Sequence, residues 1–294
     1  MNRKLSTLML AAAALLASCS QNDELQSTVN NNEGLKPMTI SVTLPEGMTT
    51  RAIATDDEKD AYCFVQILDE LGEDLEGGNS AVQGMTKAGN GYTATVYLKG
   101  EENYNFLFWA TSDDEKPEDL RNVAYTNGET LVWAGKESAA WNANGISCTL
   151  KHVVSRITLT TTTNLSVSGT NPLTITVPTT FNAYNVLNME PVKTATPSGF
   201  TYTFDPITVS GASENAPVQI GHFYALVNNE PQVLKLHYKG SLGNSEDQIP
   251  NVPLAPDTHV VLKGDVANFG LVSGTITATV ANDWTEQEHP FENF

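Results

Sequence analysis

Short runs in which apolar and polar residues alternate recur along most of the chain, and they constrain the fold more than any other feature. The run MTISVTL, residues 38 to 44, puts hydroxyl side chains on one face and four apolar side chains on the other, Met38, Ile40, Val42 and Leu44. Runs such as GYTATVYL, QVLKLHYKG and SGTITATVANDW follow the same pattern between Gly- and Pro-containing breaks. A period of two is that of a β-strand with one buried face, so we predict an all-β fold.

The strand-like runs form two series. Between them the pattern loosens over residues 113 to 145, where DDEKPEDLRNVAY is compatible with a short helix, and the second series begins at SCTLKHVVSRITL. Strands at short, regular spacing are typical of β-sandwiches, and a chain of 294 residues more often holds two domains than one. We predict β-sandwich domains over residues 38–150 and 151–294. The boundary is open by several residues on either side, since the two domains could share a strand there.

The first residues have the pattern of a lipoprotein signal. Two basic residues precede the apolar run LSTLMLAAAALLAS, which has the length of a signal-peptide core and is too short to span a bilayer. The run ends in LASC, which is similar to a bacterial lipoprotein box whose cysteine, Cys19, takes the lipid. We predict a signal peptide over residues 1–18; an ordinary secretory peptide with an incidental cysteine is the alternative.

The stretch after the signal is polar and rich in asparagine, with little to bury. We therefore predict that residues 19–37 form a flexible tether between the lipid and the folded body. Several acyl chains on Cys19 would hold the protein firmly in a membrane, since each buried methylene contributes about 0.8 kcal/mol. The membrane is thus an expected partner through the lipid.

The chain is strongly acidic, with 34 acidic and 16 basic residues and a net charge of −18. Removing residues 1–18 deletes two of these basic residues, Arg3 and Lys4, which makes the charge of the mature chain −20. Such a charge argues against nucleic acid as a partner and against electrostatic docking on anionic lipid.

The residues needed for catalysis show no recognisable arrangement. The five histidines are scattered, and no HExxH, CxxC or Gly-x-Ser-x-Gly motif occurs. The acidic clusters lack the alternating spacing of a calcium loop. We expect no enzyme activity, no metal site and no cofactor; a hydrolase with a diffuse site is the least favoured alternative.

Tryptophans and cysteines leave two questions open. Trp133 and Trp141 lie in the looser segment and are candidates for binding a sugar or a protein, with core packing as the alternative, whereas Trp109 lies in an apolar run and is expected in the core. Cys63 and Cys148 could pair in an exported protein, but each lies in a strand-like run and is better interpreted as a small buried hydrophobe.

Features spread over nearly the whole chain resemble the fimbrillin family of Bacteroidales, the subunits of type V pili. They are the box at Cys19, TTRA after the first strand, YNFLFWA, LKHVVSRITL and ITATVANDW. The resemblance implies two transthyretin-like β-sandwich domains and export as an outer-membrane lipoprotein. It also implies structural rather than catalytic roles for His152 and Arg156.

The resemblance further implies an assembly mechanism. An arginine- or trypsin-like protease would cut between Arg51 and Ala52, which removes the lipid together with the strand of residues 38–44. Other pilus subunits would then fill the open groove by β-strand addition. Loss of the strand would uncover an apolar face and an unpaired edge, which recruit another strand, whereas the uncut strand is tethered at a high effective concentration.

The identity of the donor strand and the function of the surface stay open. The last residues, TEQEHPFENF, make a poor donor, so either LVSGTITATVANDW donates or the protein only accepts a strand. The alternative function is a non-polymerising surface lipoprotein that binds a glycan, a host protein or a bacterial surface ligand through Trp133 and Trp141.

Overall fold

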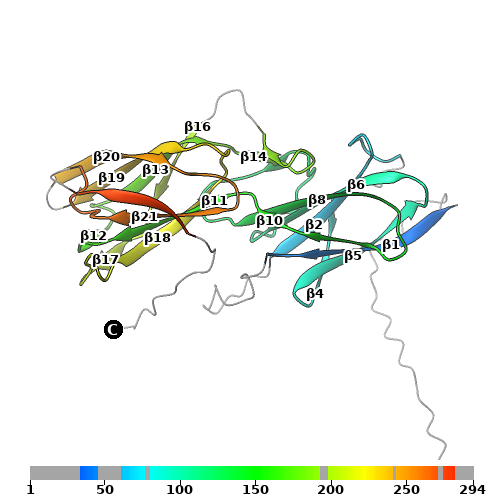
Figure 1. Cartoon of the computed structure of the whole chain (residues 1–294), viewed down its shortest axis with the longest axis horizontal. Coiled ribbons are helices and arrows are strands. Elements are labelled where there is room, and N and C mark those ends of the chain that lie inside the picture. Colours follow the sequence, from blue (N-terminus) through cyan, green and yellow to red (C-terminus); the bar gives the residue numbers. More distant parts are fainter. Residues whose placement is uncertain are drawn as a thin grey trace, which may run out of the picture. The chain divides into compact units, whose positions relative to one another are not determined.

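The fold is all-β, as predicted. The computed structural model describes residues 34–45, 61–76, 80–192, 198–240, 243–270 and 274–281, and no helix occurs within these ranges (Figure 1). None of the described residues therefore forms a helix long and apolar enough to cross a membrane. The short helix allowed for near residue 119 is absent, because the Asp119 carboxylate accepts the Arg121 amide at 2.8 Å and closes a turn.

The strands of the first half form two main sheets. One has the order β4-β5-β1-β9 and the other has the order β10-β8-β6-β2-β3. Their bounds are β1 Leu35–Thr43, β2 Tyr62–Asp69, β3 Gln83–Gly84, β4 Thr86–Ala88, β5 Gly91–Lys99, β6 Asn103–Thr111, β8 Val132–Ala140, β9 Ile146–Thr149 and β10 Lys151–His152.

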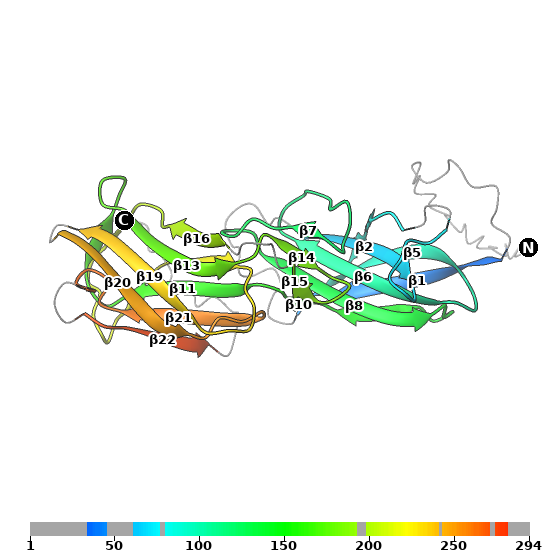
Figure 2. The same cartoon turned by 90° about the horizontal axis from the view of Figure 1, so that it is seen from above.

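The remaining strands form two four-stranded sheets, β18-β11-β21-β22 and β16-β13-β19-β20, and two small ones, β12-β17 and β15-β14-β7. Their bounds are β7 Val123–Ala124, β11 Ser155–Thr161, β12 Leu165–Val167, β13 Leu173–Thr180, β14 Ala183–Asn185, β15 Glu190–Pro191, β16 Ser198–Thr203, β17 Ile207–Val209, β18 Val218–Ala225, β19 Gln232–Gly240, β20 Gly243–Val252, β21 Thr258–Gly264 and β22 Ile276–Ala281. Figure 2 shows β22 at the edge of its sheet, beside β21.

The sheet that holds β2 and β6 is buried on both faces, which explains why these strands read as continuous apolar runs. On one face Phe64, Leu107 and Trp109 contribute to an apolar cluster that also contains Tyr184. On the other face alternate residues of the same strands, including Phe106, pack against the sheet of β1. Trp109 is only 2% exposed, so its predicted place in the core is confirmed.

Three apolar clusters stabilise the molecule. One lies between the two sheets of the first half, and another is built entirely from residues between 157 and 278. The third takes residues from both sides of residue 150, and β14 pairs with β7 across that position. Strand β10, just after residue 150, pairs with β8 of the first half. The division into domains at this residue remains a prediction.

The first strand is longer at its start than predicted. It begins at Leu35, so Lys36 and Pro37 belong to β1 and not to the tether. They pair with Leu98 and Tyr97 of β5, and this pairing makes them part of a strand that the polar stretch before them does not predict. The strand ends at Thr43, and Leu44 is partly buried against the same cluster.

Candidate functional site

The candidate functional site is the place that β1 occupies in its sheet, between β5 and β9. This strand lies between two neighbours in its sheet, antiparallel to β5 along all nine of its residues and parallel to β9 from Ile40 to Thr43. Its removal would therefore leave two unpaired strand edges facing one another, which we call the β5–β9 groove. An edge of this kind is a template for another strand.

The inward face of β1 is part of the core. Met38, Ile40 and Val42 are 1%, 0% and 1% exposed, and all three belong to the cluster between the two sheets. Burying each such side chain contributes about 1.5–3 kcal/mol to stability. The predicted apolar face thus lies where the period of two placed it, against the rest of the core.

Hydrogen bonds on the β9 side hold the second half of β1. The Ser41 hydroxyl donates to the Ile146 carbonyl at 3.2 Å, and the hydroxyls of Thr43 and Thr149 lie 3.1 Å apart. The Leu150 amide donates to the Thr43 carbonyl at 2.9 Å. The end of β1 is therefore bonded to the segment that leaves the first sheet.

A glycine turn brings β9 close to β1. Gly145 has φ +76 and its amide donates to the Asn142 carbonyl at 3.0 Å. A Cβ at residue 145 would lie 2.2 Å from the Thr39 carbonyl oxygen. Both the left-handed conformation and this close approach require glycine here.

Trp141 contacts the beginning of β1. Its indole Nε1 donates to the Pro37 carbonyl at 3.1 Å, and the Lys36 Nζ lies 4.8 Å from the ring centroid. The side chain is partly buried against the cluster that holds Met38. Trp141 is one of the two candidate ligand-binding residues, with core packing as the alternative, and the structure places it against β1.

Trp133 does not line a surface. It lies in β8, is 3% exposed and packs in the same cluster as Met38, with its ring centroid 5.8 Å from that of His152. The candidate ligand-binding role for Trp133 is therefore replaced by a role in the core. The reason is that β8 belongs to the sheet covered on both faces, which the loosened sequence pattern around this residue does not reveal.

The predicted lipidation and processing residues cannot be placed against the groove. Cys19, Arg51 and Ala52 lie outside the described residues, as does most of the tether. In the sequence Arg51 falls between β1, which ends at Thr43, and β2, which starts at Tyr62. A cut there would separate β1 from the rest of the chain.

The two cysteines of the described chain are free thiols. Cys63 and Cys148 are both buried, at 3% and 5% exposure, and no disulfide joins them. Burial raises the pKa of Cys63 to about 12 and that of Cys148 to about 11, so both thiols stay protonated. Their predicted role as small buried hydrophobes is confirmed.

Histidines and Arg156 gather on and beside the β11–β18–β21 sheet. His152 Nδ1 lies 2.8 Å from Asp257 Oδ1, and Thr158 Oγ1 lies 2.9 Å from His259 Nε2. Burial lowers the pKa of His152, and Asp257 opposes this shift. Arg156 is 3% exposed in the middle of the sheet, between its pairing partners Tyr224 and His259. Within the described residues, no group of three or more His, Cys, Asp or Glu side chains is arranged to hold a metal.

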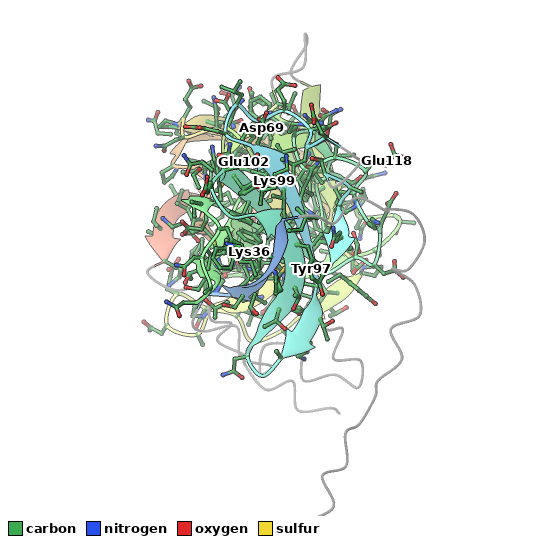
Figure 3. All side chains as sticks on the ribbon, turned by 90° about the vertical axis from the view of Figure 1, so that its right-hand side faces the viewer. Lys36, Asp69, Tyr97, Lys99, Glu102 and Glu118 are labelled. Atoms are coloured by element: carbon green, nitrogen blue, oxygen red, sulfur yellow. The ribbon has the colours of Figure 1, made fainter. Side chains whose placement is uncertain are left out.

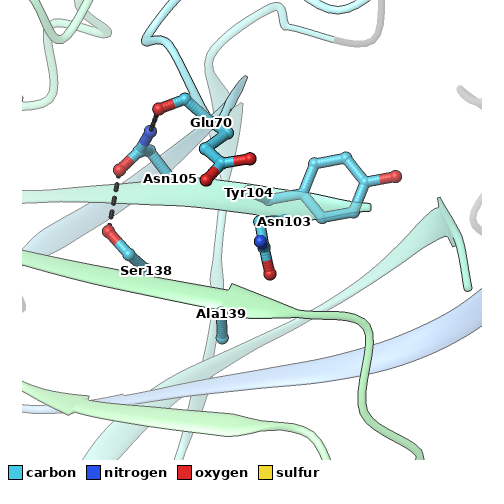
Figure 4. A pocket seen from close by; sticks show the side chains of 6 residues that line it. All are labelled: Glu70, Asn103, Tyr104, Asn105, Ser138 and Ala139. Atoms are coloured by element: carbon cyan, nitrogen blue, oxygen red, sulfur yellow. Dashed lines mark hydrogen bonds between the residues drawn. The ribbon is translucent and has the colours of Figure 1, made fainter. Parts of the chain in front are cut away.

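A small hollow at the start of β6 has a structural explanation. It has a volume of about 320 Å³ and six lining residues, Glu70, Asn103, Tyr104, Asn105, Ser138 and Ala139 (Figure 4). The Asn105 amide donates to the Asp69 and Glu70 carbonyls at 2.6 and 3.2 Å and accepts from the Ser138 hydroxyl at 2.8 Å. These bonds occupy the polar groups of Asn105, and the hollow carries no catalytic arrangement.

No protein-family model matches the sequence, and no curated protein matches it. Among solved structures, the chain is similar to a candidate cell adhesion protein from Bacteroides ovatus, with a TM-score of 0.51 and 13% identity over 86% of this chain and 99% of that one. It is also similar to a candidate cell adhesion protein from Bacteroides uniformis, with a TM-score of 0.51 and 12% identity over 86% and 99% of the two chains. The chain shares their fold.

A candidate adhesin from Bacteroides thetaiotaomicron is similar as well, with a TM-score of 0.50 and 11% identity over 83% of this chain and 97% of that one. The similarity extends over nearly the full length of each of these structures. At such low identity it establishes the fold alone, and roles for individual residues have to come from the geometry of this chain.

Sequence reasoning found the inward residues of β1 but missed most of the walls of the groove. It assigned the stretch around β9 to the beginning of the second series, although β9 pairs with β1. It also overlooked Lys36 and Gly145, which contact Trp141 and the Thr39 carbonyl. The Asn-Ala-Asn-Gly stretch before β9 indicates the turn, but the local sequence does not identify the strand with which β9 pairs.

Proposed function

We propose that the protein is a fimbrillin-like pilus subunit that contributes to adhesion. It is exported as an outer-membrane lipoprotein anchored through Cys19 and is cut by an arginine- or trypsin-like protease after Arg51. The cut detaches β1, and a strand from another subunit fills the β5–β9 groove. The protein thus acts at the cell surface and in the pilus, with other subunits as its partners and no enzymatic activity.

One observation carries this proposal. Strand β1 is an internal strand with a fully buried inward face, yet its only covalent link to the folded body in the sequence is the segment that contains Arg51. A single cut can therefore release the anchor and open a groove that demands a replacement strand. The shared fold with candidate adhesins from Bacteroides supports the same function.

Before the cut, β1 should resist exchange. As long as it belongs to the same chain, its effective concentration at the groove exceeds that of any free strand. After the cut, β1 no longer has this high effective concentration, so a donor strand attached to a growing polymer can replace it in the groove. The cut thus controls the start of assembly.

The alternative of a permanently anchored, ligand-binding lipoprotein loses one of its two candidate residues. It relied on Trp133 and Trp141 at a surface, but Trp133 is in the core. Trp141 is partly buried and hydrogen-bonds to the Pro37 carbonyl. We therefore favour the pilus subunit.

The test is mass spectrometry of the N-terminus of surface material, with an arginine-specific protease added to the purified mature chain in parallel. We expect a terminus at Ala52, and a ladder of oligomers when subunits that carry a donor strand are present. Arg51→Ala should abolish both, whereas Lys59→Ala, which removes the other basic residue of the same segment, should abolish neither. Surface material that carries only the intact, lipidated Cys19 terminus would refute polymerisation by this route.

A further inference from the structure

At the beginning of the groove the exposed basic side chain of Lys36 lies over the ring of Trp141. Lys36 lies at the start of β1 (Figure 3), with its Nζ 4.8 Å from the centroid of the Trp141 ring. The indole face attracts a cation, while the indole Nε1 donates to the neighbouring Pro37 carbonyl at 3.1 Å. The hydrogen bond from Trp141 is made to the backbone of β1, so any strand can accept it. The contact between the cation and the indole ring depends on the side chain at residue 36.

Gly100 also lies against the end of the Lys36 side chain. A Cβ at residue 100 would lie 3.0 Å from Lys36 Nζ and 3.4 Å from its Cε. Gly100 is absent from the glycines with positive φ, so its backbone does not itself require glycine. The missing side chain leaves room for a long, unbranched basic side chain between Gly100 and Trp141.

Four residues further along, the groove requires a large aliphatic side chain. Ile40 is 0% exposed and is packed in the cluster between the sheets. An alanine there would leave a cavity, because a packed core collapses only in part around a missing group. The side chains that a bound strand carries at the positions of Lys36 and Ile40 should therefore affect how tightly it binds in the groove.

Strand β22 of a second copy fits these two positions poorly. When Ile276 replaces Met38 and Val280 replaces Val42, Ala278 falls at Ile40 and Gly274 falls at Lys36. Moving the strand by two residues places Ile276 at Ile40 but puts Val272 at Lys36. No Lys or Arg occurs from Gly264 to Phe294, so no register of the C-terminal segment supplies the cation.

We propose that the β5–β9 groove selects a strand of a different protein, with Lys or Arg at the position of Lys36 and a large aliphatic side chain at that of Ile40, over β22 of a second copy. This inference rests on the proposed function, because it specifies the donor that replaces β1. Trp141 and Gly100 determine the first preference, and the core around Ile40 determines the second.

The test uses the full mature chain with Cys19→Ser and Arg51→Ala and with a recognition sequence for an unrelated, site-specific protease between residues 46 and 60. After the cut, labelled peptides compete with the detached β1, and their occupancy of the groove is measured by mass spectrometry. The native peptide, residues 35–45, is compared with its Lys36→Ala and Ile40→Ala variants and with residues 273–283 of this chain. Because this cut does not use Arg51, the groove is tested independently of natural processing.

We expect Lys36→Ala to bind about two- to fivefold more weakly than the native peptide and Ile40→Ala at least about 30-fold more weakly. The peptide of residues 273–283 should bind more weakly than either variant. A peptide with Lys36→Ala and Thr39→Lys keeps the total charge, but residue 39 points to the opposite face of the strand from residue 36. It should bind like Lys36→Ala if the contact with Trp141 matters rather than general attraction to an acidic protein.

Variants of the groove complete the test. Trp141→Ala should remove the difference between the native and Lys36→Ala peptides. Gly100→Ala should reduce it, because the added Cβ displaces the end of the Lys36 side chain by a few tenths of an ångström. Leu71→Ala, at a side chain 84% exposed, should preserve it. If the native peptide binds but Lys36→Ala or residues 273–283 bind equally well, the inference is overturned and the proposed function stands. If the native peptide does not bind the cut protein, the groove does not exchange strands and both are overturned.

Discussion

His222 shows how the surroundings of a single side chain change its pKa. It lies half-buried on β18, with Tyr224 Oη 3.4 Å from its Nε2. Burial, together with the nearby Arg156 and His259, lowers the pKa of His222 from 6.5 to about 4. The folded protein therefore favours the neutral imidazole.

The residue-scale prediction follows from this pKa. Below pH 6.5 the unfolded chain binds a proton at His222 that the folded chain does not, so stability falls between pH 6.5 and about pH 4. The loss from this residue should be on the order of 2 kcal/mol. Urea unfolding of the wild type and of His222→Gln at both pH values measures it, and the variant should lose less stability on acidification. Equal losses in the two proteins would show that His222 does not titrate in this way.

Residue roles were the part least accessible to sequence analysis. Trp133 and Trp141 lie eight residues apart in the same loosened segment and were given the same candidate role. The structure separates them, because Trp133 is enclosed within a sheet covered on both faces and Trp141 follows the end of β8 and reaches β1. Burial depends on which distant strands cover a residue, and local periodicity does not contain that information.

At the scale of elements, β1 and β9 form a pair whose separation can be observed. Cys148 of β9 lies at the pairing position of Val42 and points into the same cluster. While β1 is in place, the thiol is 5% exposed, and burial raises its pKa to about 11. It should be nearly inert to alkylation at neutral pH.

Detachment of β1 should change that reactivity. We expect the alkylation rate of Cys148 at pH 8 to rise by at least tenfold when β1 is cut and removed, because solvent reaches the thiol and its pKa falls toward the usual range. Mass spectrometry of the Cys19→Ser chain with and without β1 measures this rate. Adding the native peptide of residues 35–45 should restore protection. Unchanged labelling after removal of β1 would show that another part of the chain covers β9.

The bounds and the pairing of β1 were only partly predictable from the sequence. The inward residues of β1 followed from their period of two, since alternate side chains of a strand point to opposite faces. The start at Leu35 and the pairing with β9 did not follow from it. The start depends on the pairing of Leu35 with Lys99, and the β9 pairing joins Ile40 to Ile146, far along the chain in both cases.

At the scale of the whole molecule, the proposed cut couples two events that can be separated by design. A protease site between residues 20 and 33 would release the body from the lipid and keep β1 attached. A site between residues 46 and 60 would release the body and detach β1 as well. The difference between the two cuts isolates the groove from the anchor.

We expect the upstream cut to yield monomers and the downstream cut to yield mixed oligomers once a second subunit that carries a donor strand is supplied. Size-exclusion chromatography of the two cut proteins, each in an Arg51→Ala background, measures the outcome. The physical reason is that only the second cut removes the covalent link that keeps β1 at a high effective concentration. Oligomers after the upstream cut alone would mean that assembly does not require loss of β1.

The sequence by itself determined that the chain is all-β and which side chains of the first strand face inward, because strand periodicity is a local property of the backbone. It also placed an apolar run with a terminal cysteine before that strand and one arginine after it. Only the tertiary structure decided that β1 lies between β5 and β9, that Trp133 is core and that Trp141 and Gly100 flank Lys36. Those facts depend on pairing between distant segments, which the burial of the whole core selects and no local pattern encodes.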